Sequence, residues 1–184
     1  MKEINFYLRD SIARSNELKK RIILSKIATV NQIKGCSNEE ISILERSCGL
    51  ILPYSYKIFL KTFGRGAGRL MRDMDIFYDS VFKLTEEARE ILSDTKDPVL
   101  PENAFVFTMR YGEQFFFFEI NQGIDDPPIF YYLENATEFI KKFNSIWDFV
   151  EAEIELHEDF IAERQKYKKN NSFIKFAFSK TMKI

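Results

Sequence analysis

Cysteine, histidine and long apolar runs are scarce in this 184-residue sequence, which contains two Cys and one His. Cys36 and Cys48 stand twelve positions apart without a CxxC or CxxH pattern. They predict two reduced thiols, with a disulfide or metal site as the weaker alternative. No apolar run approaches the roughly 20 residues of a membrane span, and charges interrupt the first ten residues too often for a signal peptide. We therefore expect a cytoplasmic protein without cofactor, metal or membrane partner.

A residue set for catalysis is also missing. The one histidine, His157, stands among acidic residues, and no GxSxG or cysteine motif accompanies it. The glycine-rich segment 64–68 lacks the Lys-Ser or Lys-Thr of a phosphate loop, which favours a flexible turn. Asp73 and Asp75 begin with EF-hand spacing, but the required Gly and closing Glu are absent. We predict a protein that is not an enzyme, and a metal-dependent hydrolase using acidic loop residues is the weaker alternative.

Phenylalanine, in contrast, is abundant, with 19 copies in a chain that is 45% hydrophobic and 30% charged. A chain of this length forms one domain and buries about 70% of its unfolded surface. Because aromatic rings remove large apolar areas from water, we predict an aromatic core. The run Phe115 to Phe118 indicates a strand that is covered on both faces, or covered on one face and used for binding on the other.

Charge is distributed unevenly along the chain, although the net charge is only −1. Residues 1–68 carry 12 basic and 6 acidic side chains, whereas residues 69–146 carry 8 basic and 15 acidic ones. From 147 onward all the acids precede Arg164, and all the bases begin there. If the acidic side chains of the middle segment share a face, they produce a negative field that attracts a basic partner and repels nucleic acid.

Helices are predicted at the start of the chain. Residues 4–27 have apolar side chains at roughly helical spacing. Ser37 and Glu40 form a capping-box pattern for a second helix, which Gly49 is expected to end in a left-handed conformation. Pro53 then opens a third helix, whose apolar stripe runs to Phe63.

Strands are predicted to dominate residues 75–143, and a long helix is predicted to follow them. A short helix is predicted over 85–92, and Ser145 is expected to cap a long final helix that becomes polar near Arg164. The basic tail from 172 is predicted as a late strand, a docked arm or a disordered end. Helices segregated from an antiparallel meander indicate an α+β fold in a single domain. The predicted strands are 75–78, 81–84, 104–109, 114–120, 129–133 and 137–143. Of these, 104–109 and 114–120 are predicted to form a hairpin around the turn Tyr111, Gly112 and Glu113.

Candidate partner-binding residues follow from charge and from position on predicted loops. An exposed aromatic patch with an acidic rim would favour a protein interface, and core packing is the alternative for the Phe cluster. The candidates are two arginines of the glycine-rich turn and five loop carboxylates: Arg65, Arg69, Asp73, Asp75, Glu113, Asp125 and Asp126.

The stretch 35–66 (GCSNEEISILERSCGLILPYSYKIFLKTFGRG) resembles the signature of the SUKH superfamily, which includes the yeast cell-wall assembly regulators and many bacterial relatives. A capped helix bearing Glu is followed by Leu-Pro, an aromatic residue, Phe-Leu and a glycine turn. The resemblance covers a shared core of roughly 35–155, leaving an extra N-terminal helix at 1–30 and a basic tail at 165–184. The matching positions, mainly structural, are Glu40, Glu45, Leu52, Pro53, Tyr56, Phe59, Leu60, Gly64 and Gly66.

This resemblance implies an α+β domain with a mostly antiparallel sheet of about four to six strands and no established catalytic set. Bacterial members commonly act as immunity proteins that bind and neutralise a cognate toxin, often a nuclease. An acidic protein suits that role, because a nuclease requires a basic cleft. The alternative is a regulatory or scaffold module of the cell-wall-regulator type.

Overall fold

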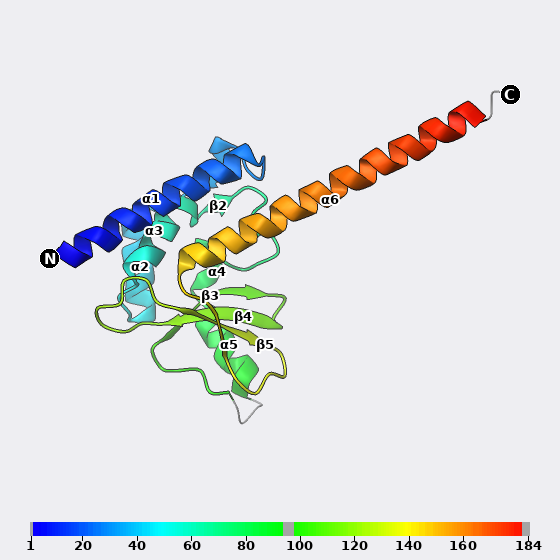
Figure 1. The fold of residues 1–184 in the computed structure, drawn as a ribbon. Helices are drawn as coiled ribbons and strands as arrows, with labels where there is room; N and C mark the ends of the chain where they lie inside the picture. The colour runs from blue at the N-terminus through cyan, green and yellow to red at the C-terminus, as the bar shows by residue number, and fades with distance from the viewer. Residues whose placement is uncertain (1, 94–97, 182–184) are drawn as a thin grey trace.

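An antiparallel sheet flanked by helices forms the α+β architecture that the sequence predicts (Figure 1). The computed structural model describes the backbone of residues 2–93 and 98–181, and the side chains of residues 10–93, 98–164 and 166. Its helices are α1 (Lys2–Leu24), the 3-10 turn η1 (Val30–Gln32), α2 (Asn38–Cys48), α3 (Tyr54–Phe63), α4 (Tyr78–Val81), α5 (Leu84–Ser93) and α6 (Ile146–Thr181). Its strands are β1 (Ile33–Lys34), β2 (Gly66–Ala67), β3 (Ala104–Arg110), β4 (Gln114–Glu119), β5 (Ile129–Leu133) and β6 (Ile140–Phe143).

The boundaries of α2 and α3 confirm the predicted capping pattern. The Ser37 hydroxyl accepts a hydrogen bond from the Glu40 backbone N–H at 3.2 Å, and the Glu40 carboxylate accepts one from the Ser37 N–H at 2.7 Å. This reciprocal pair satisfies two N–H groups that the helix leaves free. Gly49 ends α2 at φ 68°, the left-handed region that glycine adopts at low cost. Pro53 directly precedes α3.

The main sheet is a four-stranded antiparallel meander in the order β3-β4-β5-β6. The predicted hairpin is confirmed, with Arg110 opposite Gln114 on either side of the turn. One bulge interrupts β3 between Val106 and Thr108. The β3–β4 turn and the end of β5 therefore lie at one end of the sheet, while the β4–β5 loop lies at the other.

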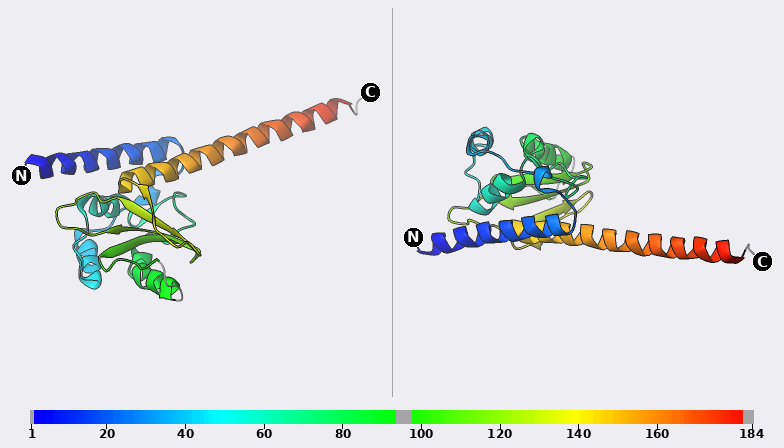
Figure 2. Two further views of the ribbon diagram at one scale, coloured as in Figure 1. Left: turned by 60° about the horizontal axis from the view of Figure 1, so that its bottom comes forward. Right: turned by 90° about the horizontal axis from the view of Figure 1, so that it is seen from above.

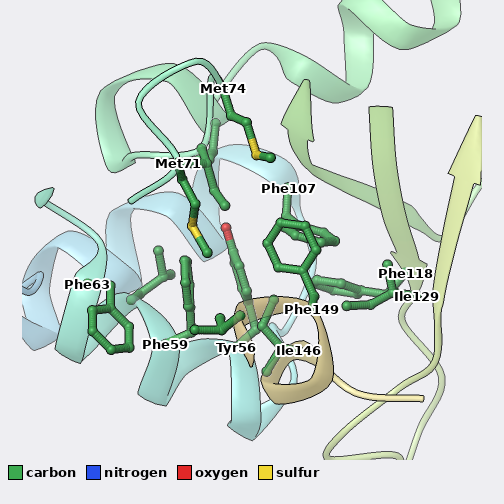
Figure 3. Close-up of a cluster of buried hydrophobic side chains, with 14 of the residues drawn as sticks. Tyr56, Phe59, Phe63, Met71, Met74, Phe107, Phe118, Ile129, Ile146 and Phe149 are labelled. Atoms are coloured by element: carbon green, nitrogen blue, oxygen red, sulfur yellow. The ribbon is translucent and has the colours of Figure 1, made fainter. Parts of the chain in front are cut away.

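Aromatic side chains fill the core on both faces of this sheet. On the face toward α3 and α6, the rings of Phe107 and Phe118 stack at 5.6 Å, and Phe118 meets the Tyr56 ring of α3 edge-on at 5.2 Å (Figure 3). On the opposite face, the Phe117 ring lies 4.8 Å from that of Phe139. Three of the four consecutive Phe side chains are fully buried, and Phe116 is half-buried. Core packing is thus the main role of the Phe run.

Helix α1 packs beside the first half of α6, and the two run in the same direction (Figure 2). Ion pairs join them: Arg14 contacts Asp148 at 2.9 Å, and Arg21 contacts Glu158 at 2.6 Å. Inside this seam, the Trp147 indole N–H donates to the Ser11 hydroxyl at 3.3 Å. Leu18 and Ile22 of α1 are buried in the core. The N-terminal helix is therefore part of the packed unit.

The predictions for the two early strands and for the basic tail are wrong. Residues 75–78 and 81–84 do not form strands, because Asp75 makes only an isolated bridge to Met109 and α4 begins at Tyr78. The glycine-rich turn contains β2, which pairs with β1. The basic tail is neither a strand nor a docked arm, since α6 continues through it to Thr181 and projects away from the body (Figure 1). Residues 182–184 of the predicted tail lie outside the described residues.

Candidate protein-binding surface

Two tight turns meet at the end of the sheet where β3 passes into β4. Tyr111 and Gly112 form the first turn with φ values of 55° and 72°. Asn135, at φ 65°, belongs to the second turn, which follows β5. The Glu134 backbone N–H donates to the Glu113 carbonyl at 2.7 Å, which joins the two turns. This end of the molecule is therefore held by backbone hydrogen bonds and presents its side chains from fixed positions.

Apolar side chains are exposed at this end. Tyr111 is 75% exposed, Leu133 48% and Ile140 of the edge strand β6 53%. Ile140 of β6 lies directly opposite Tyr131 of β5, and Leu133 lies two residues after Tyr131. The side chains of Tyr131, Leu133 and Ile140 therefore share one face of the sheet. Large apolar side chains grouped on a surface are typical of binding sites.

Helix α6 covers only part of that face. Its Phe149 ring lies 5.4 Å from Phe116 and 5.7 Å from Phe143. The helix stays packed against the body as far as Glu153 and Ile154, which are buried, and its second half projects away (Figures 1 and 2). The strip formed by Tyr131, Leu133 and Ile140 is left outside this cover, and the Tyr131 hydroxyl hydrogen-bonds the Gln114 side chain at 3.0 Å.

Carboxylates border the apolar strip. Glu113 and Glu134 are exposed on the two turns, and Asp75 is exposed beside the end of β3. For none of these three does the described part of the chain provide an ion-pair partner. Lys141 of β6 stands opposite Phe130 and so belongs to the other face of the sheet. We call the set Tyr111, Glu113, Tyr131, Leu133, Glu134 and Ile140 the acidic hairpin surface.

A buried carboxylate lies behind this surface. Glu153 of α6 is only 8% exposed, and burial raises its pKa to about 7, although Arg110 acts in the opposite direction. Arg110 is 3.8 Å from the Glu153 carboxylate and 3.0 Å from that of Asp73. Arg110 therefore compensates Asp73, and the negative charge at this end of the sheet comes from the exposed carboxylates on the turns.

A comparison with protein families identifies the family to which the chain belongs. The SUKH_6 family model, described as SMI1-KNR4 cell-wall, matches residues 38–150. The chain belongs to the SUKH superfamily. No curated protein sequence matches it at a significant level. The acidic hairpin surface lies wholly within the segment that this SUKH match covers, whereas α1 and most of α6 lie outside it.

The SUKH signature residues connect α2, α3 and the core. The Glu45 carboxylate accepts a hydrogen bond from the Leu52 backbone N–H at 3.0 Å and pairs with Lys57 at 3.1 Å, which fixes the Leu-Pro turn between the helices. At Gly64 a Cβ atom would stand 2.5 Å from the Cys36 sulfur, so a larger residue does not fit. The remaining positions are core residues or residues of the turns: Leu52, Pro53, Tyr56, Phe59, Leu60 and Gly66.

The seven candidates chosen from the sequence fall into separate places. Asp73, Asp75 and Glu113 come together at the hairpin end of the sheet. Arg69 lies in a groove beside α6. Arg65 is occupied inside the fold: it binds Asp79 at 2.7 Å and also pairs with Glu40, and its guanidinium lies 4.3 Å from the centre of the Tyr78 ring.

Asp125 and Asp126 lie at the opposite end of the sheet, where Asp125 supports the start of α3 and Asp126 supports the start of α6. The Asp125 carbonyl accepts a hydrogen bond from the Ser55 N–H at 2.9 Å, and an Asp126 carboxylate oxygen accepts one from the Ile146 N–H at 3.3 Å. Burial raises the pKa of Asp126 to about 6. These contacts serve the fold, so the acidic residues of the chain's middle do not share one face.

Sequence reasoning did not identify Leu133, Ile140 and Tyr111 as surface residues. Tyr111 was placed in the correct turn, but its exposure depends on the left-handed backbone there. Ile140 is exposed because β6 is the last strand of the sheet. Alternation along a strand indicates which residues share a face, but not where a helix stops covering it.

Two further findings bear on chemistry. Among the described residues, no group of three or more His, Cys, Asp or Glu side chains is placed to hold a metal ion. Within the same residues, no helix combines the length and apolar character needed to cross a membrane.

Proposed function

We propose that this chain is a cytoplasmic immunity protein that binds and neutralises a cognate bacterial toxin through the acidic hairpin surface, without catalysing a reaction. The observation that carries the proposal is an apolar strip, Tyr131, Leu133 and Ile140, bordered by the carboxylates of Glu113 and Glu134. An apolar centre with a charged rim is the usual composition of a protein interface. Membership of the SUKH superfamily agrees with a protein-binding role.

The sign of the charge indicates the kind of toxin. A nuclease attracts its substrate with basic side chains around the active cleft. A surface that offers carboxylates around apolar anchors blocks such a cleft and is drawn to it electrostatically. We therefore infer that the toxin presents a basic surface, with a nuclease as the first candidate.

The direct test searches the proteins encoded beside this gene for a toxin domain and uses that domain as the partner. Co-expression is expected to restore growth, and the purified proteins are expected to form a complex in size-exclusion chromatography. Titration calorimetry should show binding that weakens as salt is added. Absence of both growth rescue and a complex would overturn the immunity proposal.

The surface is tested with matched variants. Leu133→Ser combined with Ile140→Ser should weaken toxin binding roughly thousandfold, since two hot-spot residues that contribute about 2 kcal/mol each account together for about 4 kcal/mol. The control is Ile51→Ser, which changes a side chain that is 79% exposed on a loop outside the acidic hairpin surface. Equal losses in the variant and the control, or full binding by both, would show that this surface is not the interface.

The description of the matched family supports a second candidate function. The family is named for cell-wall proteins (SMI1-KNR4 cell-wall), which favours a regulatory or scaffold module with a protein ligand. A stable complex with a host protein of cell-wall assembly, together with no protection from the neighbouring toxin, would favour this second function over the first.

A further inference from the structure

A groove of about 660 Å³ lies where α6 leaves the body of the molecule. It is lined by the end of α1, by the loop 69–73 and by α6. Its lining includes the apolar side chains of Leu24 and Phe160 and the cationic side chains of Lys26, Arg69, Arg72 and Arg164. None of them belongs to the acidic hairpin surface.

The walls of the groove are fixed by contacts within the chain. Ser25 at the end of α1 donates a hydrogen bond to Glu158, and Arg21 pairs with the same carboxylate at 2.6 Å. The Arg69 N–H donates to the Ile27 carbonyl at 3.1 Å, and the Arg69 guanidinium donates to the Lys26 carbonyl. A groove that is held open in this way binds without first paying the entropy of ordering its walls.

Positive charge predominates in this groove. Lys26, Arg69, Arg72 and Arg164 all line it, and the described residues supply none of the four with a carboxylate partner. Asp73 also lines the groove, but it is engaged by Arg110 at 3.0 Å. Four uncompensated cations in one concave site attract an anionic ligand.

The groove is also apolar. Leu24 is 80% exposed and Phe160 is 60% exposed, although both are large hydrophobic side chains. Leu156 precedes Phe160 by one helical turn and is 59% exposed, so it extends the same stripe of α6. The Arg164 guanidinium lies 6.0 Å from the centre of the Phe160 ring. Cationic and apolar side chains therefore line a single site.

We propose that this groove is a second binding site, which takes an acidic peptide segment of a partner protein carrying a bulky apolar side chain. The peptide's carboxylates complement Lys26, Arg69, Arg72 and Arg164, and its apolar side chain covers Leu24 and Phe160. An aliphatic wall such as Leu24 matches a peptide side chain better than a nucleotide, which requires stacking platforms and phosphate contacts. The site is opposite in charge to the acidic hairpin surface and does not depend on the proposed function.

The test measures fluorescence anisotropy of a labelled short peptide that alternates Glu with Leu and Phe. The full-length chain is expected to bind it, with affinity falling as salt rises. A peptide with Lys in place of each Glu, and one with Ser in place of each Leu and Phe, are expected to bind at least tenfold more weakly, because each lacks one of the two complementary features. Absence of binding by the Glu peptide would overturn the proposal.

Matched variants locate the site. Arg72→Glu combined with Arg164→Glu should weaken binding of the Glu peptide about tenfold or more, because two attractive charges become repulsive. Lys141→Glu combined with Lys142→Glu, two exposed cations of β6, serves as the control and should bind normally. An equal loss in both double variants would mean nonspecific attraction and overturn the proposal.

Two further measurements complete the test. Leu24→Ser is expected to weaken peptide binding, whereas Ile51→Ser on a distant loop is not. A single-stranded oligonucleotide of equal charge should compete poorly, and competition equal to that of the peptide would assign the groove to nucleic acid instead. Thermal denaturation of each variant verifies folding. Because the toxin does not enter this assay, its outcome is separate from that of the immunity proposal.

Discussion

Removing the hydroxyl of Tyr56 is expected to stabilise this protein. Tyr56 is 1% exposed in the aromatic core, and among the described residues its hydroxyl has no hydrogen-bond partner. Figure 3 shows the oxygen pointing into the apolar cluster, toward the side where Met71 and Met74 lie. Burial without a partner also raises the pKa of this phenol well above its usual value.

The size of the effect follows from the missing hydrogen bond. A buried polar group without a partner costs about 1–3 kcal/mol relative to the same group in water. Tyr56→Phe keeps the ring and its contacts with Phe59 and Phe118, which lie 5.7 and 5.2 Å away between ring centres. We expect the free energy of unfolding to rise by about 1 kcal/mol, and the melting temperature to rise by about 2–4 °C.

Tyr78 provides the matched comparison. It is also buried, but its hydroxyl donates a hydrogen bond to the Glu40 carbonyl at 3.0 Å. Tyr78→Phe removes that bond and leaves the carbonyl with one partner fewer, so it should lower the free energy of unfolding by about 1 kcal/mol. The same chemical change is thus expected to have opposite signs at the two positions.

Urea unfolding followed by tryptophan fluorescence measures both variants, because Trp147 is fully buried. With a slope of about 2 kcal/mol per molar urea, each midpoint should move by about 0.5 M, upward for Tyr56→Phe and downward for Tyr78→Phe. A downward shift for Tyr56→Phe would mean that its hydroxyl makes a favourable interaction, and the reasoning would fail.

Three other outcomes are expected. Arg21→Gln should lower the free energy of unfolding by about 1 kcal/mol, because Arg21 pairs with both Glu151 and Glu158. The pKa of Glu153 in the folded state is raised to about 7. The protonated form therefore stabilises the fold, and this stability should be lost as pH rises from about 5 to above 7. Glu153→Gln should flatten that part of the pH profile of the free energy of unfolding, as measured by urea unfolding. Calcium, magnesium, manganese and zinc should leave the melting temperature unchanged.

A specific result would contradict each of these three predictions. Arg46→Gln, at an exposed arginine near the end of α2, is the control for Arg21→Gln, and an equal loss in both would remove the role given to the seam between α1 and α6. An unaltered pH profile for Glu153→Gln would mean that this carboxyl titrates normally. A metal-dependent rise in melting temperature would revive the hydrolase alternative.

The features that were predictable from the sequence are those that depend on near neighbours. The Ser37–Glu40 capping box and the left-handed Gly49 involve residues close together in the chain, and both lie where the pattern indicates. The hairpin around Tyr111 was likewise predictable, because turn residues separate two apolar runs.

The features that were missed depend on residues far apart in the chain. Residues 75–78 have the composition of a strand, yet the Tyr78 N–H bonds to the Gly64 carbonyl at 2.8 Å and starts a helix there. Asp79 belongs to the acidic segment 69–146, but its charge is neutralised by Arg65, which lies outside that segment. The cationic groove was missed because its walls come from both ends of the chain. Local patterns carry no information on such pairings.

The seam between α1 and α6 has a practical consequence for defining the minimal folding unit. The SUKH pattern spans 38–150, but a fragment with those limits would lose Leu18 and Ile22 and uncover the Trp147 ring. Each buried aliphatic side chain contributes about 1.5–3 kcal/mol, a large part of the net stability of a domain. The segment that identifies the family is therefore shorter than the packed unit, and fragments prepared for binding studies should retain both terminal helices.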